Sequence, residues 1–191
     1  NLLENLFGEM AALPMVMLSG YLGQGYYGLS LAFDQPFTWS QFGGASYSWS
    51  VILNRVFGTE FLVEQSYPYI VGASTGWAES KWHTLFSWLA SDLTFPGTIV
   101  FLGVVGFYFG RTWKEALLYL NPFSILLVVL LCIGVFYIPA NNQLMHSPGG
   151  LWTLGWVIFL YNRFSAAFNF DFYSSTSAGS LYADTEKHSD A

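Results

Sequence analysis

Residues 91–110 read SDLTFPGTIVFLGVVGFYFG, and this stretch decides the fold class. No charged residue occurs between Asp92 and Arg111. Two further apolar runs follow, PFSILLVVLLCIGVFYI at 122–138 and GGLWTLGWVIFLYNRF at 149–164. With its aromatic flanks, each run approaches the roughly 17 to 20 residues that a helix needs to cross a bilayer. The pattern therefore predicts membrane-spanning helices near 95–113, 121–139 and 146–164.

The composition agrees with a membrane environment. The chain is 53% hydrophobic and 20% aromatic, and 9% of its residues are charged, whereas soluble domains carry about 25% charged residues. So few charges cannot cover a globular surface, and we expect lipid to cover part of it. The net charge of −6 and the lack of a basic stripe exclude nucleic acid as a partner. The sequence predicts an all-α, polytopic integral membrane protein.

A fourth span is predicted near 9–33, EMAALPMVMLSGYLGQGYYGLSLAF, as a kinked or re-entrant helix because Pro14 and several glycines interrupt it. The glycine pattern at 23–28, GQGYYG, matches a dinucleotide-binding fingerprint, but no strand precedes it. We interpret these glycines as positions of close helix packing or of a local break in the helix. Tyr26 and Tyr27 would then present hydroxyl groups near the outer interface.

Positive charge predicts the orientation of these spans. Arg111 and Lys114 lie in one short connection, which we expect in the cytoplasm. The connection 139–150 has no Lys or Arg and is expected outside. A long loop over 34–90 then also lies outside, and the C-terminus is cytoplasmic. These assignments make residues 1–172 a membrane domain, and 173–191 a polar tail that is predicted to be disordered.

The predicted outer loop is rich in tryptophan. It contains an amphipathic stretch, YSWSVILNRVF at 47–57, which predicts a short helix along the membrane surface. Its tryptophans have two interpretations, an interfacial aromatic belt or a set of platforms for the flat faces of sugar rings. The tryptophans in or near this loop are Trp39, Trp49, Trp77, Trp82 and Trp88.

Ionisable residues gather just before the first clear span, in SKWHTLFSWLASDLTFPG at 80–97. A helix over 80–94 would place Lys81, Trp88 and Asp92 on one face, with His83 roughly opposite. Asp92 is either the cap of the following helix or a carboxylate that takes a proton from a substrate hydroxyl. The spacing of histidines and the single cysteine does not predict a metal site.

The segment WHTLFSWLASDLTFPGTIVFLGVVGFYFG at 82–110 resembles the W-x-T-x-F…D-x-x-x-x-G pattern of bacterial O-antigen polymerases, the Wzy-type oligosaccharide repeat unit polymerases. The stretches YLGQGYYGLSLAF at 21–33 and SYPY at 66–69 resemble the family in the same order. The resemblance implies a glycosyltransferase that joins repeat units carried on undecaprenyl diphosphate, at the outer face of the bacterial inner membrane. Because the family has more spans, it also implies that this chain is the C-terminal part of a larger bundle.

The resemblance further implies roles for site residues. Arginines in outer loops of the family engage the diphosphate, which points to Arg55, although Ser66 departs from the family's R-x10-G pattern. The alternative for Arg55 is a snorkelling charge at the edge of the 47–57 helix. Asp92 is the preferred group to deprotonate or orient the acceptor hydroxyl, and His83 comes second. The predicted substrate contacts are Lys81, Trp82, Trp88, Tyr67, Tyr26 and Tyr27.

The predicted partners are lipid-linked oligosaccharide, membrane lipids, and a chain-length regulator and flippase of the same pathway, with no cofactor. Three alternatives remain open. An O-antigen ligase would use the same donor with a different acceptor. A transporter is disfavoured because the centres of the three clear spans contain no Asp, Glu, Lys or Arg. A non-catalytic membrane subunit is the third.

Overall fold

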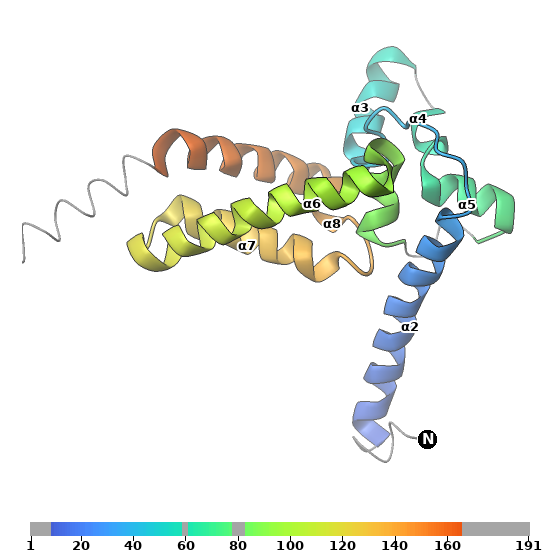
Figure 1. Ribbon diagram of the computed structural model, residues 1–191, viewed down its shortest axis with the longest axis horizontal. Helices are drawn as coiled ribbons and strands as arrows, with labels where there is room; N and C mark the ends of the chain where they lie inside the picture. The colour runs from blue at the N-terminus through green and yellow to red at the C-terminus, as the bar shows by residue number, and fades with distance from the viewer. Residues whose placement is uncertain (1–8, 59–60, 78–82, 166–191) are drawn as a thin grey trace, which may run out of the picture. The chain divides into compact units, whose positions relative to one another are not determined.

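The computed structural model describes residues 9–58, 61–77 and 83–165, and every regular element in these ranges is a helix (Figure 1). This confirms the predicted all-α class. The chain forms two compact units. Unit 1 contains the described residues up to Gly103 together with Ile133–Leu151, and unit 2 contains Val104–Cys132 together with the described residues from Trp152.

Unit 1 is built from helices packed around a small core. Its helices are α2 (Glu9–Ala32), α3 (Tyr47–Phe57), α4 (Phe61–Glu64), α5 (Tyr67–Thr75), the start of α6 (Leu85–Tyr119), the end of α7 (Pro122–Tyr137) and α8 (Gln143–His146). Helix α2 follows the span predicted near 9–33 and continues through Pro14. It packs against α5, and the buried core residues are Ala32, Tyr67, Val71 and Ala90.

The predicted outer loop over 34–90 contains α3, α4, α5 and the first turn of α6. Helix α3 matches the predicted amphipathic helix at 47–57. Its start is capped by Ser46, whose hydroxyl accepts a hydrogen bond from the Trp49 N–H, and its end is marked by Gly58 at a φ of 68°. Serine caps and left-handed glycines are the usual helix boundaries, so local sequence fixes this helix.

Helix α6 is broken at Thr94, which adopts φ 64° and ψ 165°. The Thr94 hydroxyl accepts a long hydrogen bond of 3.4 Å from the Gly97 N–H and so caps the segment that follows. Pro96 lies in the first turn of that segment, where its missing N–H has no helical partner to lose. The long helical part therefore begins after Thr94 and reaches Tyr119, beyond the predicted end at 113.

The prediction of a helix over 80–94 is wrong at its start, because α6 begins at Leu85 and residues 83 and 84 are not helical. Lys81 and Trp82 lie outside the described residues. Trp88 and Asp92 do share a helical face, one turn apart. Leu85, three residues before Trp88, lies on the same face, so the described part of the expected stripe is present.

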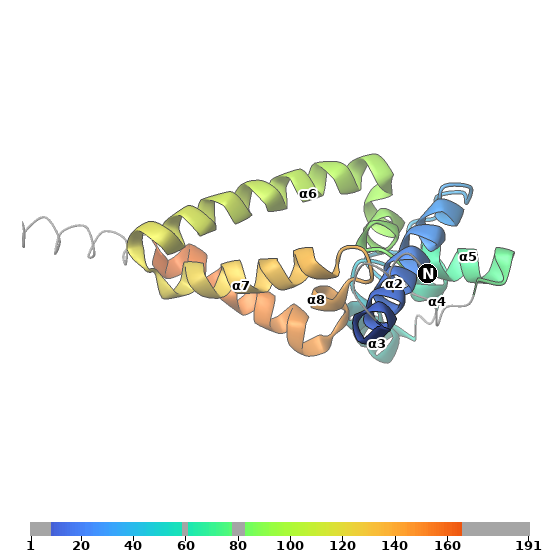
Figure 2. The ribbon, with the colours of Figure 1, turned by 90° about the horizontal axis from the view of Figure 1, so that it is seen from below.

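Unit 2 consists of the later part of α6, the first part of α7 and a helix that reaches residue 165. This last helix begins at 148, close to the predicted start at 146. The buried core side chains of unit 2 are Leu127, Val157 and Tyr161. Figures 1 and 2 show the end of α6, the start of α7 and the end of the last helix close together.

A polar network centred on Glu115 joins these three helix ends. The Glu115 carboxylate accepts hydrogen bonds from Arg111 Nε at 3.0 Å, Ser124 Oγ at 3.3 Å and Ser165 Oγ at 2.9 Å. Asn121 Nδ2 donates to Ser165 Oγ at 2.7 Å. Because each helix contributes to the network, it fixes the three ends to one another.

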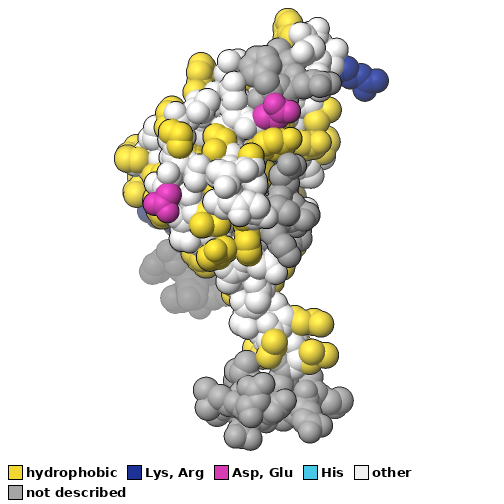
Figure 3. Space-filling model, turned by 90° about the vertical axis from the view of Figure 1, so that its right-hand side faces the viewer, with side chains coloured by type: hydrophobic (Ala, Val, Ile, Leu, Met, Phe, Trp, Pro, Cys, Tyr) yellow, Lys and Arg dark blue, Asp and Glu magenta, His cyan; other side chains and the backbone are white. Residues whose placement is uncertain are grey.

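Among the described helices, α6 is the one long and apolar enough to cross a membrane, and α7 is apolar but shorter. Only 6% of the apolar window of α6 is buried inside the structure. Large apolar side chains such as Ile99, Val100 and Phe107 are about 70% exposed. Hydrophobic side chains are also spread over the face of the molecule in Figure 3, with few charges among them.

Candidate functional site

Asp92 binds a loop that is about fifty residues earlier in the chain. Its Oδ1 accepts hydrogen bonds from Ser40 Oγ and the Phe42 N–H, and its Oδ2 accepts one from the Ala45 N–H, each at 2.7 Å. The Asp92 side chain is 9% exposed. Hydrogen bonds to a charged acceptor are among the strongest in proteins. We call residues 39–45 the clamped loop.

Further hydrogen bonds hold the clamped loop against the start of α6. The Ser40 N–H donates to the Ser91 carbonyl at 3.2 Å, and Ser40 Oγ accepts from the Gly44 N–H at 3.0 Å. Ser91 Oγ in turn accepts from the Tyr67 N–H at 2.9 Å, which fixes the start of α5. Two neighbouring residues of α6 therefore organise both the loop and α5.

The opposite side of the same segment is bound to α8 and its cap. Asn142 Nδ2 donates to the Ala45 carbonyl at 2.6 Å, and His146 Nε2 lies 3.1 Å from the Gly44 carbonyl oxygen. The hydroxyls of Ser46 and Ser48 donate to the Met145 and His146 carbonyls, at 2.9 Å and 2.6 Å. The clamped loop is therefore held between α6 and α8 by hydrogen bonds on both sides.

The backbone of the clamped loop is strained. Gln41 and Phe42 have φ values of 50° and 68°, in the left-handed region that side chains disfavour. The next two positions, Gly43 and Gly44, require glycine. A Cβ atom at either one would collide with the backbone of Ser40, Leu62 or Trp88. Two consecutive left-handed residues persist only where the surroundings determine them. Here the bonds to Asp92 supply that constraint.

Strained as it is, the clamped loop brings two aromatic side chains to the surface. Trp39 is 52% exposed and Phe42 is 53% exposed, and their ring centroids lie 6.1 Å apart at an interplanar angle of 77°. Gln41, between them in the sequence, is also exposed. A buried carboxylate thus fixes the position of an exposed aromatic pair.

His83 is buried at the entry to α6, with 1% of its surface exposed. Neither ring nitrogen has a hydrogen-bond partner in the described part of the chain, and the same holds for Thr84 Oγ1 and Ser87 Oγ. Burial lowers the pKa of His83 to about 4, so the ring is neutral near pH 7. Buried polar atoms without partners are costly, and they point to a bound water or ligand group.

Two glycines of α2 make room for this polar cluster. A Cβ atom at Gly28 would lie 2.6 Å from His83 Nδ1, and one at Gly25 would collide with the Pro139 carbonyl oxygen. Gly25 and Gly28 are close-packing positions, but the segments that they approach, at Pro139 and His83, are not helical, so the structure does not show the expected packing of helix against helix there. Gly23 lies in the same pattern, but a Cβ atom there would meet nothing within 4 Å.

A second histidine, His146, lies beside Trp88, as His83 does. The Trp88 ring contacts His146 edge to face at 4.4 Å between centroids, and its centroid lies 6.4 Å from that of His83. Burial lowers the pKa of His146, and its hydrogen bond with the Gly44 carbonyl opposes that shift. His146 therefore serves the clamped loop, whereas the nitrogens of His83 remain available.

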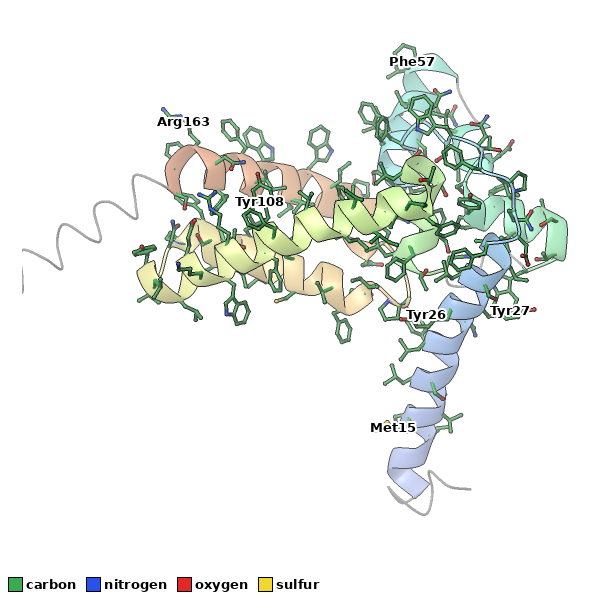
Figure 4. All side chains as sticks on the ribbon, in the orientation of Figure 1. Met15, Tyr26, Tyr27, Phe57, Tyr108 and Arg163 are labelled. Atoms are coloured by element: carbon green, nitrogen blue, oxygen red, sulfur yellow. The ribbon has the colours of Figure 1, made fainter. Side chains whose placement is uncertain are left out.

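The predicted site residues are partly brought together. Asp92, His83 and Trp88 lie at the start of α6, and Tyr67 joins them through its backbone bond to Ser91. The other described candidates lie on different helices. These are Tyr26 and Tyr27, exposed on α2 (Figure 4), and Arg55, exposed in the last turn of α3.

Capping of the following helix by Asp92 was predicted as one alternative, and this is wrong. Thr94 provides the cap, and the hydrogen bonds of Asp92 go to the clamped loop. Because both carboxylate oxygens accept hydrogen bonds, the geometry favours His83 over Asp92 as the proton acceptor. The partners of Asp92 were missed in the sequence, although the short polar stretch WSQFGGAS at 39–46 is a visible signal of a special loop.

No protein-family model, curated protein or solved structure matches the chain. Within the described ranges, no group of three or more His, Cys, Asp or Glu residues is arranged to hold a metal ion.

Proposed function

We propose that this chain belongs to a membrane glycosyltransferase that polymerises oligosaccharide repeat units carried on undecaprenyl diphosphate. The enzyme would act at the outer face of a bacterial inner membrane, with α6, α7 and the helix over 148–165 among its spans. One observation carries the proposal. The buried polar groups of His83, Asp92 and Ser40 lie at the entry to α6, whose apolar part begins two residues after Asp92.

A lipid-linked saccharide needs such a boundary. Its polyprenyl tail is soluble only in hydrocarbon, while its sugars and diphosphate need polar groups and water. The apolar residues after Thr94 suit the tail, since they are exposed and only 6% of the apolar window of α6 is covered by protein. The polar cluster before Thr94 suits the reacting sugars. The two chemistries meet within one turn of the helix.

The residues of the site suit glycosyl transfer. A hydroxyl of the acceptor sugar gives up its proton as its oxygen attacks the anomeric carbon of the donor, and the diphosphate leaves with the electron pair of the broken bond. The ring nitrogens of His83 have no hydrogen-bond partner among the described residues, so the neutral ring offers a nitrogen that can accept a proton. Arg55 is exposed at the end of α3, and its guanidinium can form paired hydrogen bonds to a phosphate.

Deletion of the gene in its bacterium tests the proposal against the alternatives. Loss of a polymerase leaves surface saccharide of a single repeat, because single repeats are still attached to the acceptor when no polymer is made. Loss of a ligase leaves polymer on the lipid carrier and none at the surface. Loss of a transporter keeps repeats inside the cell, and loss of a non-catalytic subunit shifts only the distribution of polymer lengths. Any of the last three results would contradict the proposal.

Complementation then tests the residues. His83→Gln should restore the protein to normal abundance but not the polymer, because the amide cannot accept a proton near pH 7. Arg55→Lys should lose most polymer, since lysine cannot form the paired contact. Arg163→Lys, at an exposed arginine on the last helix, is the matched control and should restore full polymer. Full polymer from Arg55→Lys would instead favour a snorkelling charge.

A further inference from the structure

We infer that Asp92 is a positioning residue, and that the Trp39–Phe42 pair on the loop that it holds is the platform for a sugar ring of the lipid-linked substrate. The inference rests on the proposed function and adds the contact by which the saccharide is recognised. It separates the roles of two groups that the sequence placed together. Asp92 fixes the binding surface, and His83 takes the proton.

The hydrogen bonds of Asp92 come from one segment of the chain. All three groups that donate to Asp92 belong to the clamped loop, namely Ser40 Oγ and the N–H groups of Phe42 and Ala45. Both oxygens of the Asp92 carboxylate are occupied by these three bonds of 2.7 Å, so a substrate hydroxyl would have to compete with the loop for them. The loop is therefore the partner of Asp92.

This arrangement also keeps strain in the backbone of the loop. Left-handed residues with side chains are disfavoured, and the loop contains two of them in a row, Gln41 and Phe42. The Phe42 N–H is also a donor to Asp92. The carboxylate thus enforces the backbone conformation that brings the Phe42 ring to the surface beside Trp39. Strain of this kind gathers at binding sites, where it fixes a surface before the ligand arrives.

The exposed side chains of the clamped loop indicate the ligand. Trp39 and Phe42 expose about half of their surface and meet edge to face, which leaves ring faces for a flat apolar surface. The exposed amide of Gln41 can both donate and accept hydrogen bonds, as sugar hydroxyls require. Aromatic anchors in a lipid interface need neither a left-handed backbone nor a buried carboxylate to hold them. The observations therefore favour a saccharide over a membrane anchor.

Steady-state kinetics of the full-length protein in proteoliposomes test this role. The substrate is the lipid-linked oligosaccharide fraction extracted from membranes of the deletion strain. Trp39→Leu should raise KM about tenfold with kcat nearly unchanged, because leucine keeps the apolar character but has no ring face. Trp39→Phe should stay close to wild type. Trp156→Leu, at an exposed tryptophan of unit 2, is the control and should leave KM unchanged.

Variants of the clamp should give the same signature. Asp92→Asn turns one acceptor into a donor that faces the Ala45 N–H, and Ser40→Ala removes another donor of the clamp. Each should raise KM about tenfold. The KM of the double variant should be no higher than that of the single variant with the higher KM, because both substitutions act through one loop. The pH profile of kcat should not change. A loss of kcat in Asp92→Asn at wild-type KM would make Asp92 the base and overturn the inference.

A binding measurement separates failure of the inference from failure of the proposed function. If the wild-type protein forms no polymer from the extracted fraction, the proposed function fails. Titration calorimetry with saccharide released from that fraction by mild acid still tests the platform. Trp39→Leu should weaken binding about tenfold and Trp39→Phe should not. Equal binding by wild type and Trp39→Leu would assign the aromatic pair to the lipid interface and overturn the inference.

Discussion

Asp92 Oδ2 accepts a hydrogen bond of 2.7 Å from the backbone N–H of Ala45, 47 residues earlier in the chain. The bond joins the last charged residue before the apolar part of α6 to a strained surface loop. The start of the apolar helix and the loop are therefore directly connected.

Close packing of the clamped loop predicts a contrast between two glycines. Gly44→Ala would place a methyl group against Ser91 Cβ and 2.9 Å from the Trp88 carbonyl oxygen. We expect a loss of about 2 kcal/mol in the free energy of unfolding. Gly23→Ala, where a Cβ atom meets nothing within 4 Å, should be neutral or stabilising by about 0.5 kcal/mol. Thermal unfolding of the purified variants measures both, and equal melting temperatures would contradict the contrast.

The break in α6 predicts opposite effects from two substitutions at Thr94. Thr94→Gly relieves the positive φ and should stabilise the protein by about 1 kcal/mol, because glycine also serves as a helix cap at little cost. Thr94→Ala keeps the strain and loses the hydroxyl that binds the Gly97 N–H, so it should destabilise by about 1 kcal/mol. Chemical denaturation of wild type, Thr94→Gly and Thr94→Ala ranks the three proteins by their free energy of unfolding. If alanine proves as stable as glycine, the break is not strained.

Burial of His83 predicts a loss of stability in mild acid. Its pKa is lowered from 6.5 to about 4 in the folded state. As the pH falls from 6.5 towards 4, the unfolded chain binds a proton that the folded chain does not. The cost is on the order of 2 kcal/mol at pH 5 relative to neutral pH.

Substitution isolates this contribution of His83. The drop in melting temperature between pH 7.5 and pH 5 should be smaller in His83→Gln than in wild type. Some drop should remain, because burial also lowers the pKa of His146. An identical drop in both proteins would show that His83 is already protonated or solvated in the folded state.

The proposed membrane topology predicts that positions 113 and 149 lie on opposite sides of the membrane. Trp113 is exposed, and a Cβ atom at Gly149 meets nothing within 4 Å, so cysteine fits at either position. The background is Cys132→Ser, because the native cysteine is exposed. An impermeant maleimide added to intact cells should label Gly149→Cys but not Trp113→Cys until the membrane is opened. Labelling of both from outside would exclude the arrangement.

Much of the helical framework can be predicted from the sequence. The amphipathic helix at 47–57 has a serine cap, a left-handed glycine at its end and a hydrophobic period, so local sequence determines it. The apolar runs likewise predicted α7 and the last helix to within a few residues. These elements depend on interactions between near neighbours in the chain, which a sequence displays directly.

The site was only partly predictable, because its main bonds join distant segments. The sequence singled out Asp92, but a cap and a base both suited its position before Pro96. Its true partners, Ser40, Phe42 and Ala45, include two backbone N–H groups that no residue type reveals. The start of α6 was also missed, since helix propensity alone does not explain why it begins at Leu85. There the Leu85 N–H bonds to the Ile138 carbonyl, a contact between distant parts of unit 1.

Reconstitution of the full-length protein tests the proposed function most directly. Purified protein in liposomes would receive lipid-linked repeat units from the deletion strain as its only substrate, and the products would be separated by gel electrophoresis. We predict a ladder of saccharides that grows with time on the lipid carrier, and no ladder with His83→Gln. The proposed function would be contradicted if the folded wild-type protein consumed no substrate, so that the gel showed single repeats alone.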